Sequence, residues 1–135
     1  MHFADRRKAA FVIVGSVLVT GSLVALVLSL GSWAFQTRRF LFHERRLAPL
    51  VEKHATLSDI SAGLLAEPGN REIAVPEFEE EFVALVGQWR GGLEPAILAK
   101  RRTARDVRIF EVRDMVYILF FDAEGRLQDY VLLSN

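Results

Sequence analysis

The architecture of this chain is decided by the stretch AAFVIVGSVLVTGSLVALVLSLGSWAFQT, residues 9–37. It contains no Asp, Glu, Lys or Arg, and most of its residues are Val, Leu, Ile, Ala, Gly or Phe. An α-helix rises about 1.5 Å per residue and the hydrocarbon core of a bilayer is about 30 Å thick, so roughly 20 apolar residues are enough to cross it. The sequence therefore predicts one transmembrane helix over residues 9–37.

A basic tail, residues 1–8, precedes this helix and ends in Arg6-Arg7-Lys8. A cleavable signal peptide has the same order, and here Ser32 and Ala34 would be the small residues before the cut. The apolar region of a secretory signal is usually about 7–15 residues long, which is much shorter than residues 9–37. We therefore expect an uncleaved signal-anchor.

The orientation of the helix should follow the bias of Lys and Arg near its two ends. The bias is small, because cations follow the span at positions 38, 39, 45 and 46 as well as preceding it. Three cations directly against the apolar run favour an amino terminus inside the cell. The expected location is a bacterial inner membrane, with the C-terminal part outside the cytoplasm.

Small residues recur in the span at Gly21, Ala25 and Ser29. This spacing lets two helix backbones approach closely within lipid, so these residues are a candidate helix–helix contact. The alternative is that they only reflect the usual composition of transmembrane helices. No charged group lies inside the span, which favours an anchor over an ion or proton pathway.

Residues 38–55 form a basic, amphipathic juxtamembrane segment. Its aromatic and aliphatic residues would lie at the membrane interface, and its arginines are candidate contacts to lipid headgroups; these are Arg38, Arg39, Arg45 and Arg46. The alternative is a helix end with ordinary snorkelling cations. Pro49 disfavours helical geometry at Ala48, so we expect a break or bend there.

Residues 56–135 are predicted to form one small α+β domain. Thr56 and Asp59 suggest a capped helix that ends near Glu67, and residues 68–75 read as an irregular connection. A second helix follows Pro76, with its apolar face over residues 78–89 and an acidic first turn. Gly91-Gly92 ends it. The basic block over residues 100–105 is either an intramolecular complement to the acidic helix or a solvated loop.

The last third of the domain predicts a three-stranded antiparallel meander over residues 107–112, 115–121 and 127–133. Arg113-Asp114 makes a tight connection, and Asp122–Gly125 is typical of a type I turn with a left-handed glycine. The central strand is apolar on both sides and needs cover on both faces. The helix over residues 78–89 can cover one. The other must meet another element of the chain, a subunit or the membrane surface. It is a candidate partner or pocket face carrying Tyr117, Leu119, Phe121 and Tyr130.

Composition argues against most chemistries. The chain has 17 basic and 17 acidic residues, so no overall field favours nucleic acid, and it has no cysteine for a thiol nucleophile, a disulfide or lipid attachment. None of His2, His43 and His54 has a metal-ligand spacing, and residues 122–126 lack the further ligands of a calcium loop. We expect no enzyme activity, no metal and no cofactor.

The order of an acidic helix ending in Leu85-Val-Gly87, then Tyr117-Ile-Leu-Phe-Phe-Asp122 and Gly125-Arg-Leu, resembles the small periplasmic domains of the SmpA/OmlA outer-membrane assembly lipoproteins. The resemblance covers roughly residues 76–133 and implies a scaffold or assembly role with no catalytic residue. The chain departs from that family in lacking a lipobox cysteine, in carrying a full span, and in having Trp89 where such proteins often turn with proline.

Two functions follow as hypotheses. The first is a single-pass accessory or assembly protein whose α+β domain binds a membrane or envelope protein, or a second copy of itself. The alternative is a membrane-tethered ligand-binding or sensory module with an apolar pocket on the sheet, although a small-molecule ligand is the less expected partner.

Overall fold

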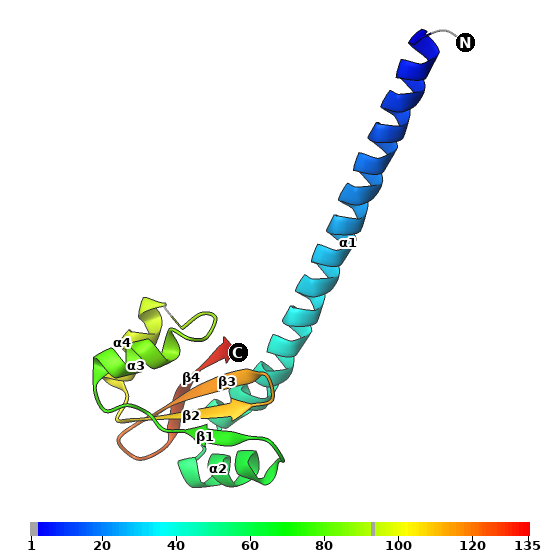
Figure 1. Cartoon of the computed structure of the whole chain (residues 1–135). Helices are drawn as coiled ribbons and strands as arrows, with labels where there is room; N and C mark the ends of the chain where they lie inside the picture. Colours follow the sequence, from blue (N-terminus) through cyan, green and yellow to red (C-terminus); the bar gives the residue numbers. More distant parts are fainter. Residues whose placement is uncertain (1–2, 93) are drawn as a thin grey trace. The chain divides into compact units, whose positions relative to one another are not determined.

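The computed structural model describes residues 3–92 and 94–135 and divides into two compact units, Met1–Leu41 and Phe42–Asn135. The α+β class is confirmed, with a sheet of four strands in place of the expected three. Figure 1 labels the elements in chain order: α1 (Phe3–Glu52), α2 (Leu57–Ala66), β1 (Arg71–Ile73), α3 (Glu79–Val86), α4 (Pro95–Thr103), β2 (Asp106–Val112), β3 (Met115–Phe121) and β4 (Leu127–Ser134).

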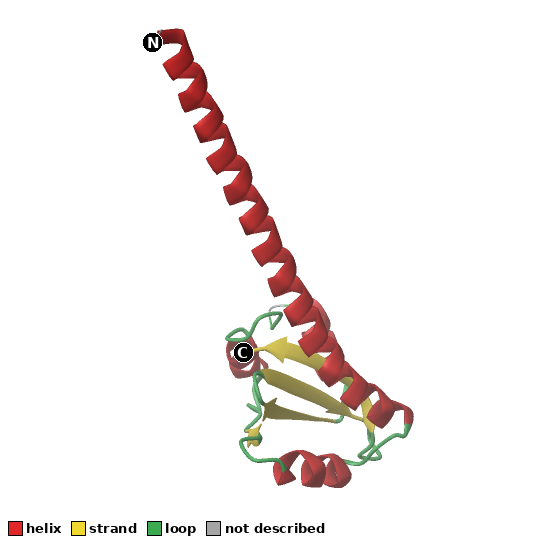
Figure 2. Cartoon of the chain, turned by 90° about the vertical axis from the view of Figure 1, so that its right-hand side faces the viewer, coloured by secondary structure: helices red, strands yellow, loops and turns green. Residues whose placement is uncertain are grey.

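The first unit consists of the greater part of α1, which Figure 2 shows as one uninterrupted helix. No residue in its most apolar window is buried, and side chains such as Phe11 and Leu28 are more than half exposed. By length and composition this helix is long and apolar enough to cross a membrane.

The second unit is built on the antiparallel sheet β1-β2-β3-β4. The expected bounds of the last three strands are confirmed to within one residue. The connection over residues 68–75 is not irregular throughout, because Arg71–Ile73 pairs with Glu111–Ile109 of β2 as a fourth strand. Three residues are too few to show an alternating pattern in the sequence, and an ion pair of 2.7 Å between Arg71 and Glu111 supports the pairing.

The turns of the meander follow the expected chemistry. Gly125 has a φ of +75° and donates its N–H to the carbonyl of Asp122 at 3.1 Å, as the type I turn requires. The Asp122 carboxylate also accepts the backbone N–H groups of Glu124 and Arg126. The connection between β2 and β3 is tight, with Arg113 in the left-handed region at φ +59°.

All seven residues of β3 are buried, because the chain covers both faces of its own sheet. One face packs against the end of α1 and against α2 through Leu47, Ile60 and Leu64. The opposite face packs against α3 and α4 through Phe82 and Ile97. The expected helix therefore covers one face, and the last turns of α1 with α2 cover the other, so among the alternatives of another element, a subunit or the membrane surface it is the chain itself that covers this face.

The helix α1 continues through Pro49 to Glu52, so the expected break at Ala48 is wrong. Pro49 lies within the last turn, where its missing N–H removes a single helical hydrogen bond. Leu47 is 1% exposed, and this burial holds the segment against the sheet. The compact domain consequently begins at Phe42, whereas we expected it to begin at residue 56.

The shorter helices agree with the sequence in part. Thr56 is the N-cap of α2, accepting the N–H of Asp59, as expected. Helix α3 is shorter than its apolar pattern, ending at Val86. The backbone of Gly92 lies close to the end of α3, and a Cβ added at Gly92 would lie 1.6 Å from the carbonyl oxygen of Val86. Only glycine fits that position without a shift of the backbone.

Candidate functional site around His43 and Tyr117

The most distinctive group of polar residues in the domain lies beneath the last turns of α1. His43 is the buried polar residue of the described core, with 1% of its surface exposed. Its Nδ1 lies 2.5 Å from the hydroxyl of Tyr117, a residue of β3 with no exposed surface. The two rings meet edge to face, with their centroids 5.4 Å apart. The pair therefore joins the amino-terminal helix to the centre of the sheet.

Burial decides the protonation of the phenol. It raises the pKa of Tyr117 to about 12, with opposing contributions from the positive charges of Arg46 and Arg113 and a reinforcing one from Glu67. The phenol thus keeps its proton at neutral pH. It can donate to an unprotonated Nδ1 of His43 or accept from a protonated one, according to the tautomer of the ring.

An ion pair between α1 and the end of α2 borders this pair. Arg46 donates to Glu67 at 2.5 Å, and Asn70 donates to the same carboxylate at 2.9 Å and to the carbonyl of Leu64 at 3.1 Å. The hydrogen bonds from Arg46 and then Asn70 lower the pKa of Glu67. Asn70 satisfies a carbonyl at the end of α2, so the network also caps that helix.

Arginines from two distant parts of the domain meet at the exposed ring of Phe42. The guanidinium of Arg46 lies 5.9 Å from the ring centroid, and that of Arg113, from the β2–β3 turn, lies 5.2 Å from it. Both distances are within the range of cation–π attraction. The ring remains 45% exposed, so this cluster is at the surface of the domain.

A groove of about 330 Å³ lies between the end of α1 and α2, with Tyr117 among its lining residues. Its walls are mainly aliphatic, from Leu50, Ile60 and Leu64, and its charged border is Arg46 with Glu67. The residues that the structure describes contain no group of three or more metal-ligating side chains.

The predicted partner face is not open. Tyr117, Leu119 and Phe121 are at most 1% exposed beneath α1 and α2, and they form part of the core. Tyr130 of β4 is partly buried, and burial followed by the charge of Glu44 raises its pKa. The chain's own helices therefore cover this face of the sheet, and the groove beside α2 lies at its edge.

The predicted lipid contacts separate into different environments. Arg38 and Arg45 are exposed, whereas Arg46 is held by Glu67 and is only partly exposed. Arg39 is also partly exposed. In the first unit, Gly21, Ala25 and Ser29 are exposed on α1, and a Cβ added at Gly21 would meet nothing within 4 Å.

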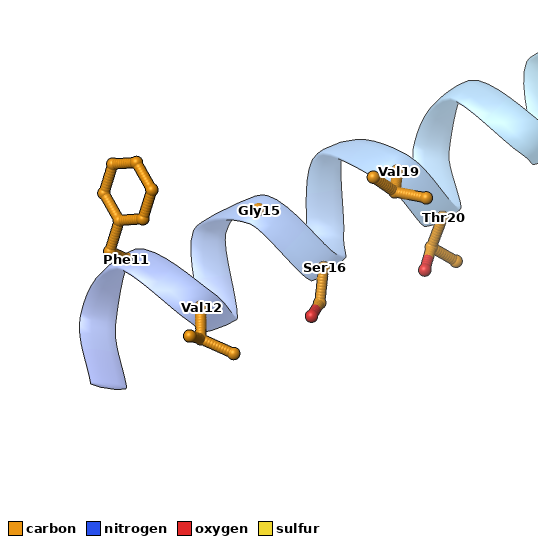
Figure 3. A pocket seen from close by; sticks show the side chains of 6 residues that line it. All are labelled: Phe11, Val12, Gly15, Ser16, Val19 and Thr20. Atoms are coloured by element: carbon orange, nitrogen blue, oxygen red, sulfur yellow. The ribbon is translucent and has the colours of Figure 1, made fainter. Parts of the chain in front are cut away.

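A shallow hollow lies further toward the amino terminus of α1. Figure 3 shows its lining side chains, among which Val12, Ser16 and Thr20 point to one side and Phe11 points away. The hollow lies over Gly15, and α1 alone forms its wall. It is a feature of the helix surface and encloses no ligand volume.

The basic block of α4 is the intramolecular complement that the sequence suggested. Arg102 pairs with Glu79 at 2.5 Å, and Arg101 donates to the carbonyl of Glu77 at 2.9 Å while lying 4.9 Å from the ring centroid of Phe82. These contacts hold α4 against α3. Lys100 of the same block pairs with Asp129 of β4 at 3.0 Å, so the basic block contacts both the acidic helix and the sheet.

Sequence reasoning missed the pair of His43 and Tyr117 and the contact of Arg113 with Phe42. One signal for the first was present, because His43, Leu47 and Leu50 recur at the spacing of one helix face. A histidine on an apolar face indicates burial, and burial requires a hydrogen-bond partner. Nothing local to Arg113 indicated its neighbour.

Comparisons of the chain with protein-family models, curated proteins and solved structures found no match.

Proposed function

We propose that this chain is a single-pass membrane protein whose C-terminal α+β domain is a non-enzymatic accessory or assembly subunit. The observation that carries the proposal is the apolar surface of α1 over residues 9–37, in which no residue is buried and the large apolar side chains are exposed. Exposing that much apolar surface to water is strongly unfavourable, whereas lipid is a matched solvent for it. The α+β domain that follows in the chain covers both faces of its own sheet, as expected of a folded module that is tethered by a membrane helix.

The contact to a partner is proposed to run through the span. The sheet faces are used internally, so the apolar central strand gives no support to a partner docked on the sheet. Gly21, Ala25 and Ser29 remain uncovered and lie at the spacing that permits close helix approach. The resemblance to assembly lipoproteins supports the same role.

The alternative, a ligand-binding module with a pocket on the sheet, has less support. It required an open face carrying Tyr117 and Phe121, and these side chains are covered by the chain's own helices. The remaining groove beside α2 is narrow and is bordered by an ion pair.

The experiment on anchoring and orientation uses the full chain. A reporter that is active only outside the cytoplasm is fused after Asn135, and a reporter active only inside is fused in a parallel strain. We expect membrane sedimentation that resists alkaline carbonate, with activity of the outside reporter. A soluble product, or a chain cut within residues 9–37, would overturn the anchor. Activity of the inside reporter alone would reverse the proposed orientation.

The experiment on the contact compares Gly21→Ile with Gly31→Ile. An added side chain meets nothing within the chain at either glycine, so both variants should leave the fold unchanged. Gly31 lies off the helix face that carries Gly21 and Ala25. We expect wild type and Gly31→Ile to form a cross-linkable complex in mild detergent that Gly21→Ile loses. Equal behaviour of the two variants, or a monomeric wild type, would contradict the proposed contact.

A further inference from the structure

The turn between β2 and β3 places an arginine in an unfavourable backbone conformation. Arg113 has a φ of +59°, in the left-handed region that glycine and asparagine adopt far more readily. Residues held in such conformations cluster at functional positions, which makes the side chain the feature to explain. The Arg113 side chain is exposed, so packing in the core does not account for it.

The fold brings this side chain to Phe42, at the start of the domain. The guanidinium of Arg113 lies 5.2 Å from the centroid of the Phe42 ring. Arg46, on the other hand, is engaged by Glu67. Among the residues that the structure describes, Arg113 forms no ion pair, so its guanidinium retains donors for an external anion.

Covalent connection fixes how far this cluster can be from the end of the apolar stretch. Phe42 follows Thr37 by five residues, which is roughly 7–8 Å of helix at about 1.5 Å per residue. The headgroup region on each side of a bilayer is about 5–8 Å thick. Roughly 20 residues are enough to cross the hydrocarbon core, so residues 9–37 are longer than the crossing requires. A crossing segment that ends at Thr37 places Phe42 at the level of the headgroups.

We propose that Phe42 and Arg113 form a binding site for anionic lipid headgroups, in which the Arg113 guanidinium binds a lipid phosphate. The ring of Phe42 supplies an apolar contact at the interface, and arginine binds phosphate through two parallel N–H donors. Exposed Arg45 adds positive charge on α1. Glu44 is next to Arg45 in the sequence and Asp114 is next to Arg113, so these two acids limit the net positive charge of the site. The inference rests on the proposed membrane anchor.

The test exploits the absence of cysteine from the chain. The backbone N–H of Asn135 donates to the carbonyl of Asp114 at 3.2 Å, so Asn135→Cys carries a spin label beside the turn without altering the site. The control label is Glu124→Cys in the β3–β4 turn, at the other end of strand β3. The full chain is placed in nanodiscs that contain a nickel-chelating lipid, with phosphatidylcholine alone or with added phosphatidylglycerol.

We expect nickel to relax the label at residue 135 severalfold more strongly than the label at residue 124, and more strongly with phosphatidylglycerol than without it. Arg113→Asn should remove the effect of phosphatidylglycerol. Because asparagine tolerates the left-handed conformation, this variant should melt at or above the temperature of the wild type, which separates lipid binding from folding. Arg126→Gln, a loss of an exposed cation at the opposite turn, should retain the effect.

Three results would overturn the inference. Equal relaxation with and without phosphatidylglycerol in chains that do enter nanodiscs would overturn the lipid site alone. The same would follow from an Arg113→Asn variant that behaves as the wild type does. A chain that does not enter nanodiscs at all would refute the membrane anchor, and the lipid site with it.

Discussion

The hydrogen bond between His43 and Tyr117 makes a quantitative prediction about the stability of the domain. Tyr117→Phe removes one hydroxyl from a site with no exposure and leaves the imidazole of His43 without this partner. Losing one partner of a buried polar pair costs about 1–3 kcal/mol. At about 2 kcal/mol, the melting temperature of a domain of this size should fall by roughly 8–16 °C.

The sharper form of this prediction is a double-mutant cycle. His43→Leu should cost a similar amount, because it leaves the Tyr117 hydroxyl buried without its partner. Replacing both polar groups removes the unsatisfied atoms together, so the double variant should be less destabilised than the sum of the single variants by about 1–2 kcal/mol. Unfolding is measured on the full chain in mild detergent by urea titration and is followed by circular dichroism and by tryptophan fluorescence, to which Trp89 of the domain and Trp33 of α1 both contribute.

The control is Tyr130→Phe on the neighbouring strand. Tyr130 is only partly buried, and among the described residues its hydroxyl forms no hydrogen bond, so its removal should change the free energy of unfolding by less than about 0.5 kcal/mol. Additive effects at positions 43 and 117, or equal effects of the two tyrosine variants, would refute the reasoning that the pair is a coupled part of the core.

Three other predictions follow from the same domain. The pKa of Tyr117 is about 12 in the folded domain and about 10 in the unfolded chain, so the stability that its proton contributes is complete below pH 10 and is lost as the pH rises towards 12. The difference in the free energy of unfolding between wild type and Tyr117→Phe should therefore become smaller from pH 10 to pH 12. A difference that stays constant over this range would contradict the pKa shift. The pKa of Glu67 is lowered, so its contribution is present above pH 4.5 and is lost as the pH falls through the folded value; urea titrations at several acidic pH values should show a weaker decline for Glu67→Gln than for wild type. Gly92→Ala should destabilise the domain by about 2–4 kcal/mol, because the added Cβ would collide with the backbone of Val86. Gly63→Ala in α2 should stabilise the domain by about 0.5–1 kcal/mol, because a Cβ there meets nothing within 4 Å and alanine favours the helix. Thermal melts in which the two variants have equal effects would contradict both expectations.

The parts of the fold that the sequence predicts well are those with a local cause. The Val, Ile, Phe and Tyr content of residues 107–133 predicts three strands, and Gly125 marks the turn that joins the last two. Thr56 predicts the start of α2 because a side-chain cap is a contact between near neighbours. The acidic and basic blocks predict the pairing of α3 with α4 because opposite charges on adjacent elements attract.

The parts that it misses depend on contacts between distant residues. The strand β1 exists because Arg71–Ile73 meets β2, and three residues contain no pattern of their own. His43 and Tyr117 are 74 residues apart, so neither sequence environment reveals the other. Pro49 is a local signal that tertiary packing overrides, since the burial of Leu47 outweighs one missing hydrogen bond. The same long-range packing decides which element covers the sheet face of Tyr117, a choice that the sequence left open.

The sharing of α1 between the two units determines where the domain can be cut. A recombinant fragment that begins at residue 56 would lack Leu47 and His43, and it would leave the sheet face of Tyr117, Leu119 and Phe121 uncovered. Such a fragment should aggregate, because exposed β-rich apolar surface promotes association. A fragment that begins at or before Phe42 retains the covering turns. A cellular protease that cuts between residues 42 and 55 would thus separate the domain from the turns of α1 that cover its sheet, whereas one that cuts before residue 42 would release the domain intact.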